Sequence, residues 1–265
     1  MTSVPERAYA RILVTVEAGA LRIALHNPAR KNAIGAVMVS ELLWALEDAH
    51  ATGDVRAIVI TGSGDAFCAG GDFAQMSGAE TASDALAHKG DYADLLLAMT
   101  RATKPIVARV NGAAMGGGLG IVAASHFAIA DEAAKLGTPE VDVGLFPMMI
   151  MAVLARVVPQ RRLLSMMLLG EKMTGRDAAE LGLVGKAVAK GELDGEVDRI
   201  VAALVTKSPA AIRMGLQAWA DQADATLADA LPMLRGRLGA ILGTDDAREG
   251  LTAFLEKRAP RWTGK

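Results

Sequence analysis

Hydrophobic residues in the first hundred positions recur at the spacings of strands and helices. Two short apolar segments, Arg11–Val16 and Leu21–His26, flank a turn that contains glycine, which predicts a β-hairpin. The apolar positions of Gly35–Ala51 follow the spacing of a helix with one buried face. Ser83–Thr100 is predicted to be a second helix, with Ser83 as its N-cap.

Two uninterrupted apolar runs, Val55–Gly62 and Pro105–Val110, are typical of strands that are buried on both faces. Strands and helices then alternate through Val188, so we predict an α/β fold of βαβ units with a mostly parallel sheet. After Gly195 the pattern contains no strand. We therefore expect an α/β domain over residues 1–195 and a helical region over residues 196–265, with helices at Glu196–Thr206, Pro209–Asp221, Leu227–Leu242 and Asp245–Lys257.

A glycine-rich segment follows each of these two apolar runs. Phe67-Cys68-Ala69-Gly70-Gly71-Asp72 comes after the first, and Gly116-Gly117-Gly118 comes after the second, just before an apolar helix. Small residues let a ligand approach the backbone, and the N–H groups at a helix start carry partial positive charge. Two such loops at matching ends of parallel strands can each donate one N–H to the same oxygen. The alternative is that these glycines only permit tight packing.

A carboxylate follows the second glycine loop, in the turn Thr138-Pro139-Glu140. A carboxylate beside a site for an oxyanion suits proton transfer next to a carbonyl group. A glutamate after proline is also common as a solvated turn residue or helix cap. Its occurrence together with two glycine loops favours the catalytic interpretation.

Three motifs point to a known family. The segments FCAGGD, KPIVARVNGAAMGGGLG and ADEAAKLGTPEVDVGLFP resemble, in order and spacing, the crotonase superfamily, also called the enoyl-CoA hydratase/isomerase family. The resemblance runs from HNPARKNA to FLEKRAPRW and so covers nearly the whole chain. It implies a spiral of ββα units with mostly parallel sheets, a C-terminal helical trimerisation region, and a coenzyme A thioester as substrate.

The resemblance also assigns roles to individual residues. The N–H groups of Gly71 and Gly117 would form an oxyanion hole for a thioester enolate, with no room for a side chain at Gly117. Glu140 would be the acid/base. Typical family hydratases carry a further glutamate where this chain has Gly120. The pattern is similar to that of family isomerases that use the later glutamate alone, so we expect double-bond isomerisation or an atypical hydration, and Gly120→Glu should raise hydration if the cavity admits it.

The segment after Glu140 bears on the acyl group. The dienoyl-CoA isomerases and chlorobenzoyl-CoA dehalogenases of the family place a catalytic aspartate where this chain has Met148, so neither chemistry is expected. Gly144–Met151 is apolar and includes Phe146 and Met148. These residues either line a pocket for a bulky or branched acyl group or are adaptable core residues.

Further substrate contacts are implied by the resemblance. Arg30 and Lys31 lie in HNPARKNA, a loop that runs along coenzyme A in the family, and cations suit its phosphate groups. Lys257 and Arg258, at the end of the last helix, are additional candidates. The other candidate substrate-binding residues are Ala69, Asp72, Gly116, Gly120, Phe146 and Met148.

Cys68, His26 and His126 have side chains that can be catalytic, but we predict structural roles for all three. Cys68 is the single cysteine, so no intrachain disulfide forms, and no neighbouring residue supplies the base that a catalytic thiol needs. His26 is predicted to lie in a turn with a hydrogen-bonded ring. His126 is predicted to begin an apolar strand and to be structural.

Composition narrows the class of protein. With 265 residues, 52% of them hydrophobic and 22% charged, the chain is long enough for one globular unit or a large domain with an appendage. A net charge of −2 argues against a nucleic-acid surface. No apolar run is long enough to span a membrane, and no targeting signal precedes the first strand, so a cytoplasmic location is expected. No metal is expected, and no cofactor apart from the coenzyme A of the substrate.

A leucine stripe on one C-terminal helix needs a partner surface, because leucines repeat there at helical spacing. In the family that surface belongs to a neighbouring subunit, in trimers that often pair into hexamers, whereas packing on the chain's own core is the alternative. The stripe consists of Leu227, Leu231, Leu234, Leu238 and Leu242.

Three classes of function stay open at this point. The first is an enoyl-CoA isomerase or atypical hydratase that uses Glu140. The second is another crotonase-type enzyme, such as a thioester hydrolase or decarboxylase. The third is a non-catalytic or RNA-binding member, which the acidic balance of the chain disfavours.

Overall fold

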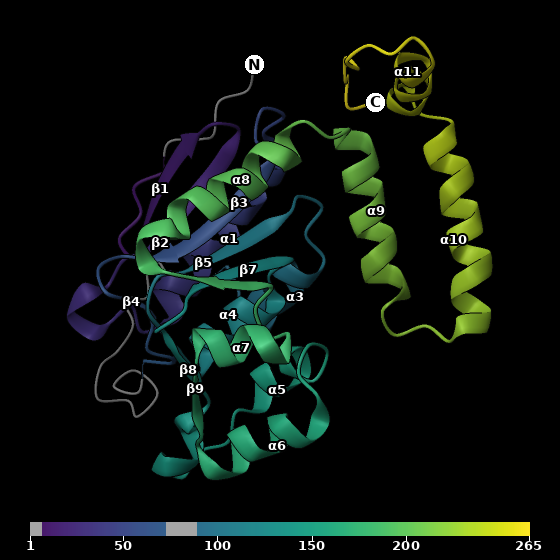
Figure 1. Cartoon of the computed structure of the whole chain (residues 1–265). Helices are drawn as coiled ribbons and strands as arrows, with labels where there is room; N and C mark the ends of the chain where they lie inside the picture. Colours follow the sequence, from purple (N-terminus) through teal and green to yellow (C-terminus); the bar gives the residue numbers. More distant parts are fainter. Residues whose placement is uncertain (1–6, 73–88) are drawn as a thin grey trace.

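The fold is built on two sheets, seen in a computed structural model that describes residues 7–72 and 89–265 (Figure 1). The larger sheet has the strand order β1-β2-β3-β5-β7-β10, and the smaller sheet has the order β4-β6-β8-β9. Neighbours are parallel except in the β1–β2 and β8–β9 pairs. The strands are β1 Ile12–Glu17, β2 Ala20–Leu25, β3 Ala57–Gly62, β4 Ala66–Cys68, β5 Ile106–Val110, β6 Ala113–Met115, β7 Phe127–Asp131, β8 Lys135–Gly137, β9 Lys172–Thr174 and β10 Lys186–Val188.

The helices cover the sheets and form the C-terminal region, so the predicted α/β fold with mostly parallel sheets and a helical end is confirmed. They are α1 Ala36–Ala51, α3 Tyr92–Thr100, α4 Gly117–Ala124, α5 Met148–Leu154, α6 Gln160–Leu169, α7 Gly175–Leu181, α8 Leu193–Val205, α9 Pro209–Gln222, α10 Leu227–Leu242 and α11 Asp245–Leu255, with 3-10 helices η1 Pro28–Arg30, η2 Pro139–Val143 and η3 Lys190–Glu192. None of the helices within the described ranges is long and apolar enough to cross a membrane.

The start of α3 differs from the prediction. Ser83 lies outside the described residues, and α3 begins at Tyr92 with Asp91 as its N-cap. The Asp91 carboxylate accepts hydrogen bonds from the N–H groups of Ala93 and Asp94, and the Asp94 carboxylate accepts one from the Asp91 N–H. This reciprocal capping box stabilises the first turn of the helix.

The central strands of the larger sheet are buried on both faces, which explains the continuous apolar runs. Successive side chains of a strand point to opposite faces. In β3, Ile58 and Ile60 belong to the main core, whereas Ala57 and Val59 belong to a second core on the other face. Both faces therefore require apolar residues, and periodicity alone could not separate them.

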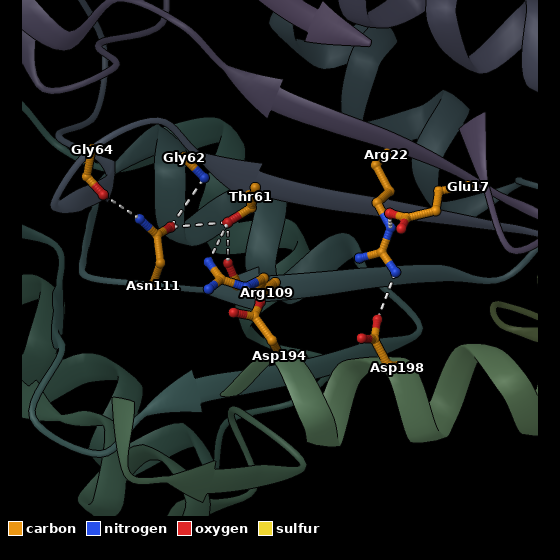
Figure 2. Close-up of polar contacts among 9 residues, drawn as sticks. All are labelled: Glu17, Arg22, Thr61, Gly62, Gly64, Arg109, Asn111, Asp194 and Asp198. Atoms are coloured by element: carbon orange, nitrogen blue, oxygen red, sulfur yellow. Dashed lines mark hydrogen bonds and ion pairs between the residues drawn. The ribbon is translucent and has the colours of Figure 1, made fainter. Parts of the chain in front are cut away.

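Helix α8 covers that second face. Leu193, Val197 and Val201 are buried at helical spacing against the sheet. Figure 2 shows two ion pairs at its margin: Arg109 reaches Asp194 at 2.6 Å, and Arg22 reaches Asp198 at 2.5 Å. The predicted division at residue 195 stays a prediction, and this packing favours an α/β unit that extends to the end of α8.

Two buried asparagines connect successive turns of the chain between the sheets. Asn111, which follows β5, donates to the Gly64 carbonyl and accepts from the Gly62 N–H, each at 3.0 Å (Figure 2). Asn32 donates to the carbonyls of Ser63 and Ala66, each at 2.9 Å. A buried amide that satisfies free backbone groups in this way fixes the loops it joins. These bonds place the smaller sheet relative to the larger one.

We expect α8 to be held by its apolar face rather than by its ion pairs. Val197→Ala should lower the free energy of unfolding by about 2 kcal/mol, because it removes buried methyl groups and leaves a cavity. Asp198→Ala removes an ion pair whose Asp198 side chain is 56% exposed, and should cost less than about 1 kcal/mol. Urea denaturation at a fixed protein concentration gives both values. An equal loss in the two variants would contradict this account of α8.

Candidate active site

A cavity of about 770 Å³ opens beside the smaller sheet and brings most of the predicted site residues together. Its walls are mainly apolar, and the ionisable side chains among its described lining residues are Asp72, Lys89, Asp91, Tyr92 and Glu140. The predicted residues that line it are Ala69, Gly71, Asp72, Gly116, Gly117, Glu140, Phe146 and Met148. Gly120, Arg30 and Lys31 do not line it.

Three short parallel strands bring the loops to this cavity. β4, β6 and β8 pair as neighbours, and each is followed at once by one of the predicted segments. The carboxyl ends of parallel strands meet at one edge of a sheet, so the three segments converge. Sequence patterns did not reveal these strands, because three residues are too few to show a periodicity.

The Gly71 and Gly117 N–H groups are both available at the cavity. Neither donates a hydrogen bond to any residue in ranges 7–72 and 89–265. Two N–H groups close to Gly71 in the chain do have partners. The Ala69 N–H donates to the Lys31 carbonyl and the Asp72 N–H donates to the Ile34 carbonyl, both at 2.9 Å. Gly117 is the first residue of α4, where helical N–H groups have no partner within the helix.

The glycine triplet packs against a different neighbour at each position. Gly116 has φ of 48°, and a Cβ there would lie 2.7 Å from Glu140 Oε1. At Gly118 a Cβ would lie 2.6 Å from Cys68 Cβ, so α4 approaches β4 more closely than a side chain allows. At Gly117 the nearest atom would be Ile34 Cδ1 at 3.4 Å. The expectation that position 117 has no room for a side chain is therefore wrong, because a methyl group fits there at ordinary contact distance.

Glu140 is the base candidate that the structure supports. It follows Pro139 in η2, and its carboxylate lies against Gly116. Oε2 is buried and has no hydrogen-bond partner in the described part of the chain. Burial raises the pKa of Glu140 above its ordinary 4.5, although the hydrogen bond from its own N–H acts in the opposite direction. A desolvated carboxylate with an unused oxygen is a stronger proton acceptor than a solvated one.

Gly120 is separated from the cavity by two side chains. A Cβ at this position would lie 2.3 Å from the Tyr92 hydroxyl oxygen and 2.5 Å from Ile150 Cγ2. Gly120→Glu was expected to raise hydration only if the cavity admits the glutamate side chain. The cavity does not admit it, because even the Cβ atom would collide with Tyr92 and Ile150.

The loop of Arg30 and Lys31 contacts the loop that contains Gly71. Arg30 Nη1 lies 2.9 Å from both carboxylate oxygens of Asp72. The Lys31 carbonyl accepts the Ala69 hydrogen bond. A direct contact of Arg30 or Lys31 with coenzyme A stays a prediction.

The apolar segment after Glu140 faces the cavity. Met148 and Met149 line it and are 65% and 50% exposed, whereas Ile150 is buried behind them. Met148 and Met149 therefore belong to the pocket wall, whereas Met151 does not line the cavity and packs against the main core, so each of the two interpretations applies to part of this segment.

The three side chains that were assigned structural roles have the surroundings expected of them. Burial raises the pKa of the Cys68 thiol to about 12, so it stays protonated. The His126 ring accepts a hydrogen bond from the Ile106 N–H at 3.0 Å, and burial lowers its pKa to about 4. The His26 ring lies 3.1 Å from the Ser63 hydroxyl. No group of three or more histidine, cysteine or acidic residues is close enough to hold a metal ion in the described ranges.

Among the residues of the cavity wall that sequence reasoning missed, Tyr92 is the one that contacts Gly117 through its hydroxyl group. Its hydroxyl donates a hydrogen bond to the Gly117 carbonyl, and its ring lies 3.6 Å from a Cβ built on Gly117. No motif marks it, because only the tertiary contact between α3 and α4 brings it to the glycine loop.

Comparisons with known proteins identify the family of this chain. A profile of the enoyl-CoA hydratase/isomerase family matches residues 15–265. A Bacillus subtilis protein named "Probable enoyl-CoA hydratase" is 34% identical over 92% of this chain and 95% of its own length. An enoyl-CoA hydratase structure from Mycobacterium smegmatis superimposes with a TM-score of 0.88 at 32% identity, covering 96% of this chain and 99% of that one.

A structure of human enoyl Coenzyme A hydratase domain-containing protein 3 superimposes with a TM-score of 0.89 at 28% identity. It covers 96% of this chain and 100% of that one. The chain therefore belongs to the enoyl-CoA hydratase/isomerase family, the crotonase superfamily, and has its fold.

Proposed function

We propose that this protein moves the double bond of an enoyl-CoA thioester. The acyl group lies in the cavity, and the N–H groups of Gly71 and Gly117 donate to the thioester oxygen. Glu140 accepts a proton from one carbon of the acyl group and returns it to another. The observation that supports this most directly is that the unpartnered carboxylate and the two unused N–H groups line the same cavity.

The reaction needs only these groups. Glu140 takes a proton from C2 of a 3-enoyl thioester, and the electron pair moves toward C1, so that the thioester oxygen becomes the oxygen of an enolate conjugated with the C3=C4 double bond. The same carboxyl group then returns the proton to C4, and the double bond moves from between C3 and C4 to between C2 and C3. The N–H donors lower the barrier because their hydrogen bonds strengthen as charge develops on the oxygen.

The surroundings of Gly120 favour isomerisation over hydration. Hydration requires a water that is held and deprotonated as well as a proton for the other carbon. Tyr92 and Ile150 fill the space where a second acid/base at position 120 would lie. Hydration is the second candidate, because the relatives bear the name enoyl-CoA hydratase.

Coenzyme A enters this proposal as part of the substrate, with no separate cofactor.

The homotrimer or hexamer is also a proposal. It is supported by exposed apolar residues on α10 and α11 and by a second cavity of about 940 Å³ between α9 and the α3–α5 side of the molecule. α9 and α10 form a pair that stands apart from the sheets (Figure 1).

The reaction is tested with purified protein and separate 2-enoyl-CoA and 3-enoyl-CoA thioesters, followed by chromatography and mass spectrometry. We expect a product of unchanged mass and a shifted double bond. A gain of one water would instead support hydration, and free acid would indicate hydrolysis. An unchanged thioester in every case would contradict the proposal.

Glu140→Gln should lower kcat at least about a hundredfold while leaving thioester binding nearly intact, since the amide cannot accept the proton. In the unmodified enzyme the base must be ionised, so kcat/KM should fall as the pH drops through the raised pKa of Glu140, above 4.5. That acid limb should be absent from the variant. Asp142→Asn is the matched control, because Asp142 is exposed and does not line the cavity. Turnover of the Gln variant within threefold of the parent would remove Glu140 from the mechanism.

Gly116→Ala should abolish turnover, whereas Gly117→Ala should keep measurable activity. Alanine at position 116 would need positive φ and would press on the Glu140 carboxylate, but at position 117 the methyl group meets only ordinary contacts. Steady-state kinetics after a check of folding by circular dichroism compares the two. Equal activity in both variants would show that the backbone of the glycine triplet is not constrained as described.

Light scattering at micromolar concentration should give a mass near three or six times the 27.5 kDa subunit. Leu238→Glu should reduce the mass, because Leu238 is 57% exposed on the α10 stripe and a charge there opposes burial. Leu13→Glu on β1, where Leu13 is 51% exposed, is the control. A subunit-sized mass for the unmodified protein would contradict the trimer.

A further inference from the structure

Three consecutive glycines pose a problem for a site that needs a precisely aimed N–H group. Glycine has more backbone freedom than any other residue, and the first turn of a helix lacks half of its hydrogen bonds. Gly117 lies in the middle of the triplet and begins α4. Some contact from outside the triplet has to fix its orientation.

Tyr92 makes that contact from a rigid position. Its hydroxyl donates to the Gly117 carbonyl, and its ring packs beside Gly117. Tyr92 is the first residue of α3, directly after the Asp91 capping box, and it packs against the main core. Burial raises the pKa of Tyr92 well above its ordinary value of 10, and the negative charge of Glu140 acts in the same direction. The hydroxyl therefore keeps the proton that it donates.

We propose that Tyr92 is a positioning residue for the oxyanion site: its hydrogen bond to the Gly117 carbonyl holds the first turn of α4 so that the Gly117 N–H faces the thioester oxygen. The inference rests on the proposed function, because it takes the Gly117 N–H as a donor to that oxygen. Tyr92 acts through Gly117 rather than on the reacting carbons.

The test compares the two tyrosines of the chain. Tyr92→Phe removes the hydroxyl and keeps the ring, and Tyr9→Phe is the matched control, because Tyr9 does not line the cavity. Loss of one hydrogen bond should lower kcat about tenfold in Tyr92→Phe, with KM within about twofold, since the misaimed donor matters most for the enolate. Tyr9→Phe should change neither constant.

The second readout does not depend on turnover. Infrared spectra of bound butyryl-CoA, labelled with ¹³C at the thioester carbonyl, report the strength of the hydrogen bonds to that oxygen. The unmodified protein should lower the carbonyl stretch relative to free butyryl-CoA, and Tyr92→Phe should recover part of the difference. Should the Phe variant fail to fold, Tyr92→Met provides the same comparison with a side chain of similar volume.

The outcomes separate the two proposals. A lowered stretch in the unmodified protein that is the same in Tyr92→Phe would overturn the role of Tyr92 and leave the oxyanion site standing. A fall in kcat without a change in the stretch would also overturn it. No lowered stretch in the unmodified protein would defeat the oxyanion site of the proposed function, and the role of Tyr92 with it.

Discussion

The convergence of three short parallel strands is the constraint on which this molecule depends. β4, β6 and β8 are three residues long each, and their pairing places Gly71, Gly117 and Glu140 around one cavity. The strands are too short to be stable alone. They are held by the larger sheet, by the buried amides of Asn32 and Asn111, and by the helices that pack over them. The geometry of the site is therefore a property of the whole α/β unit.

The glycine triplet shows how one segment meets several requirements at once. Gly116 adopts a backbone conformation that brings the chain next to Glu140, and Gly118 allows α4 to contact Cys68. Gly117 has a backbone N–H group that has no partner among the described residues and is the proposed donor. Three consecutive glycines also leave the backbone with much conformational freedom, so contacts with neighbouring residues have to restrict it. The Gly116 N–H donates to the Gly137 carbonyl, and Tyr92 contributes a side-chain hydrogen bond to the Gly117 carbonyl.

The electrostatics of the cavity follow from its apolar walls. Burial disfavours the charged form of Glu140 and leaves its Oε2 without a partner, so the carboxylate is ready to accept a proton. Two backbone N–H groups supply positive potential without introducing a full charge that would neutralise the base. Asp72, by contrast, is paired with Arg30 and has a supporting role beside the Gly71 loop.

The sequence by itself determined the α/β class, the two long central strands and the helical C-terminal region, and it supplied the candidate residues for an acid/base and an oxyanion site. These follow from hydrophobic periodicity and from motifs whose residue types have a specific chemistry, such as the glycine triplet before an apolar helix. Only the tertiary structure decided what surrounds them. It showed that α8 packs on the larger sheet, that a methyl group fits at Gly117, and that Tyr92 and Ile150 close off Gly120. Contacts between residues far apart in the chain leave no local pattern, because close packing depends on where the elements lie in space rather than on their order in the sequence.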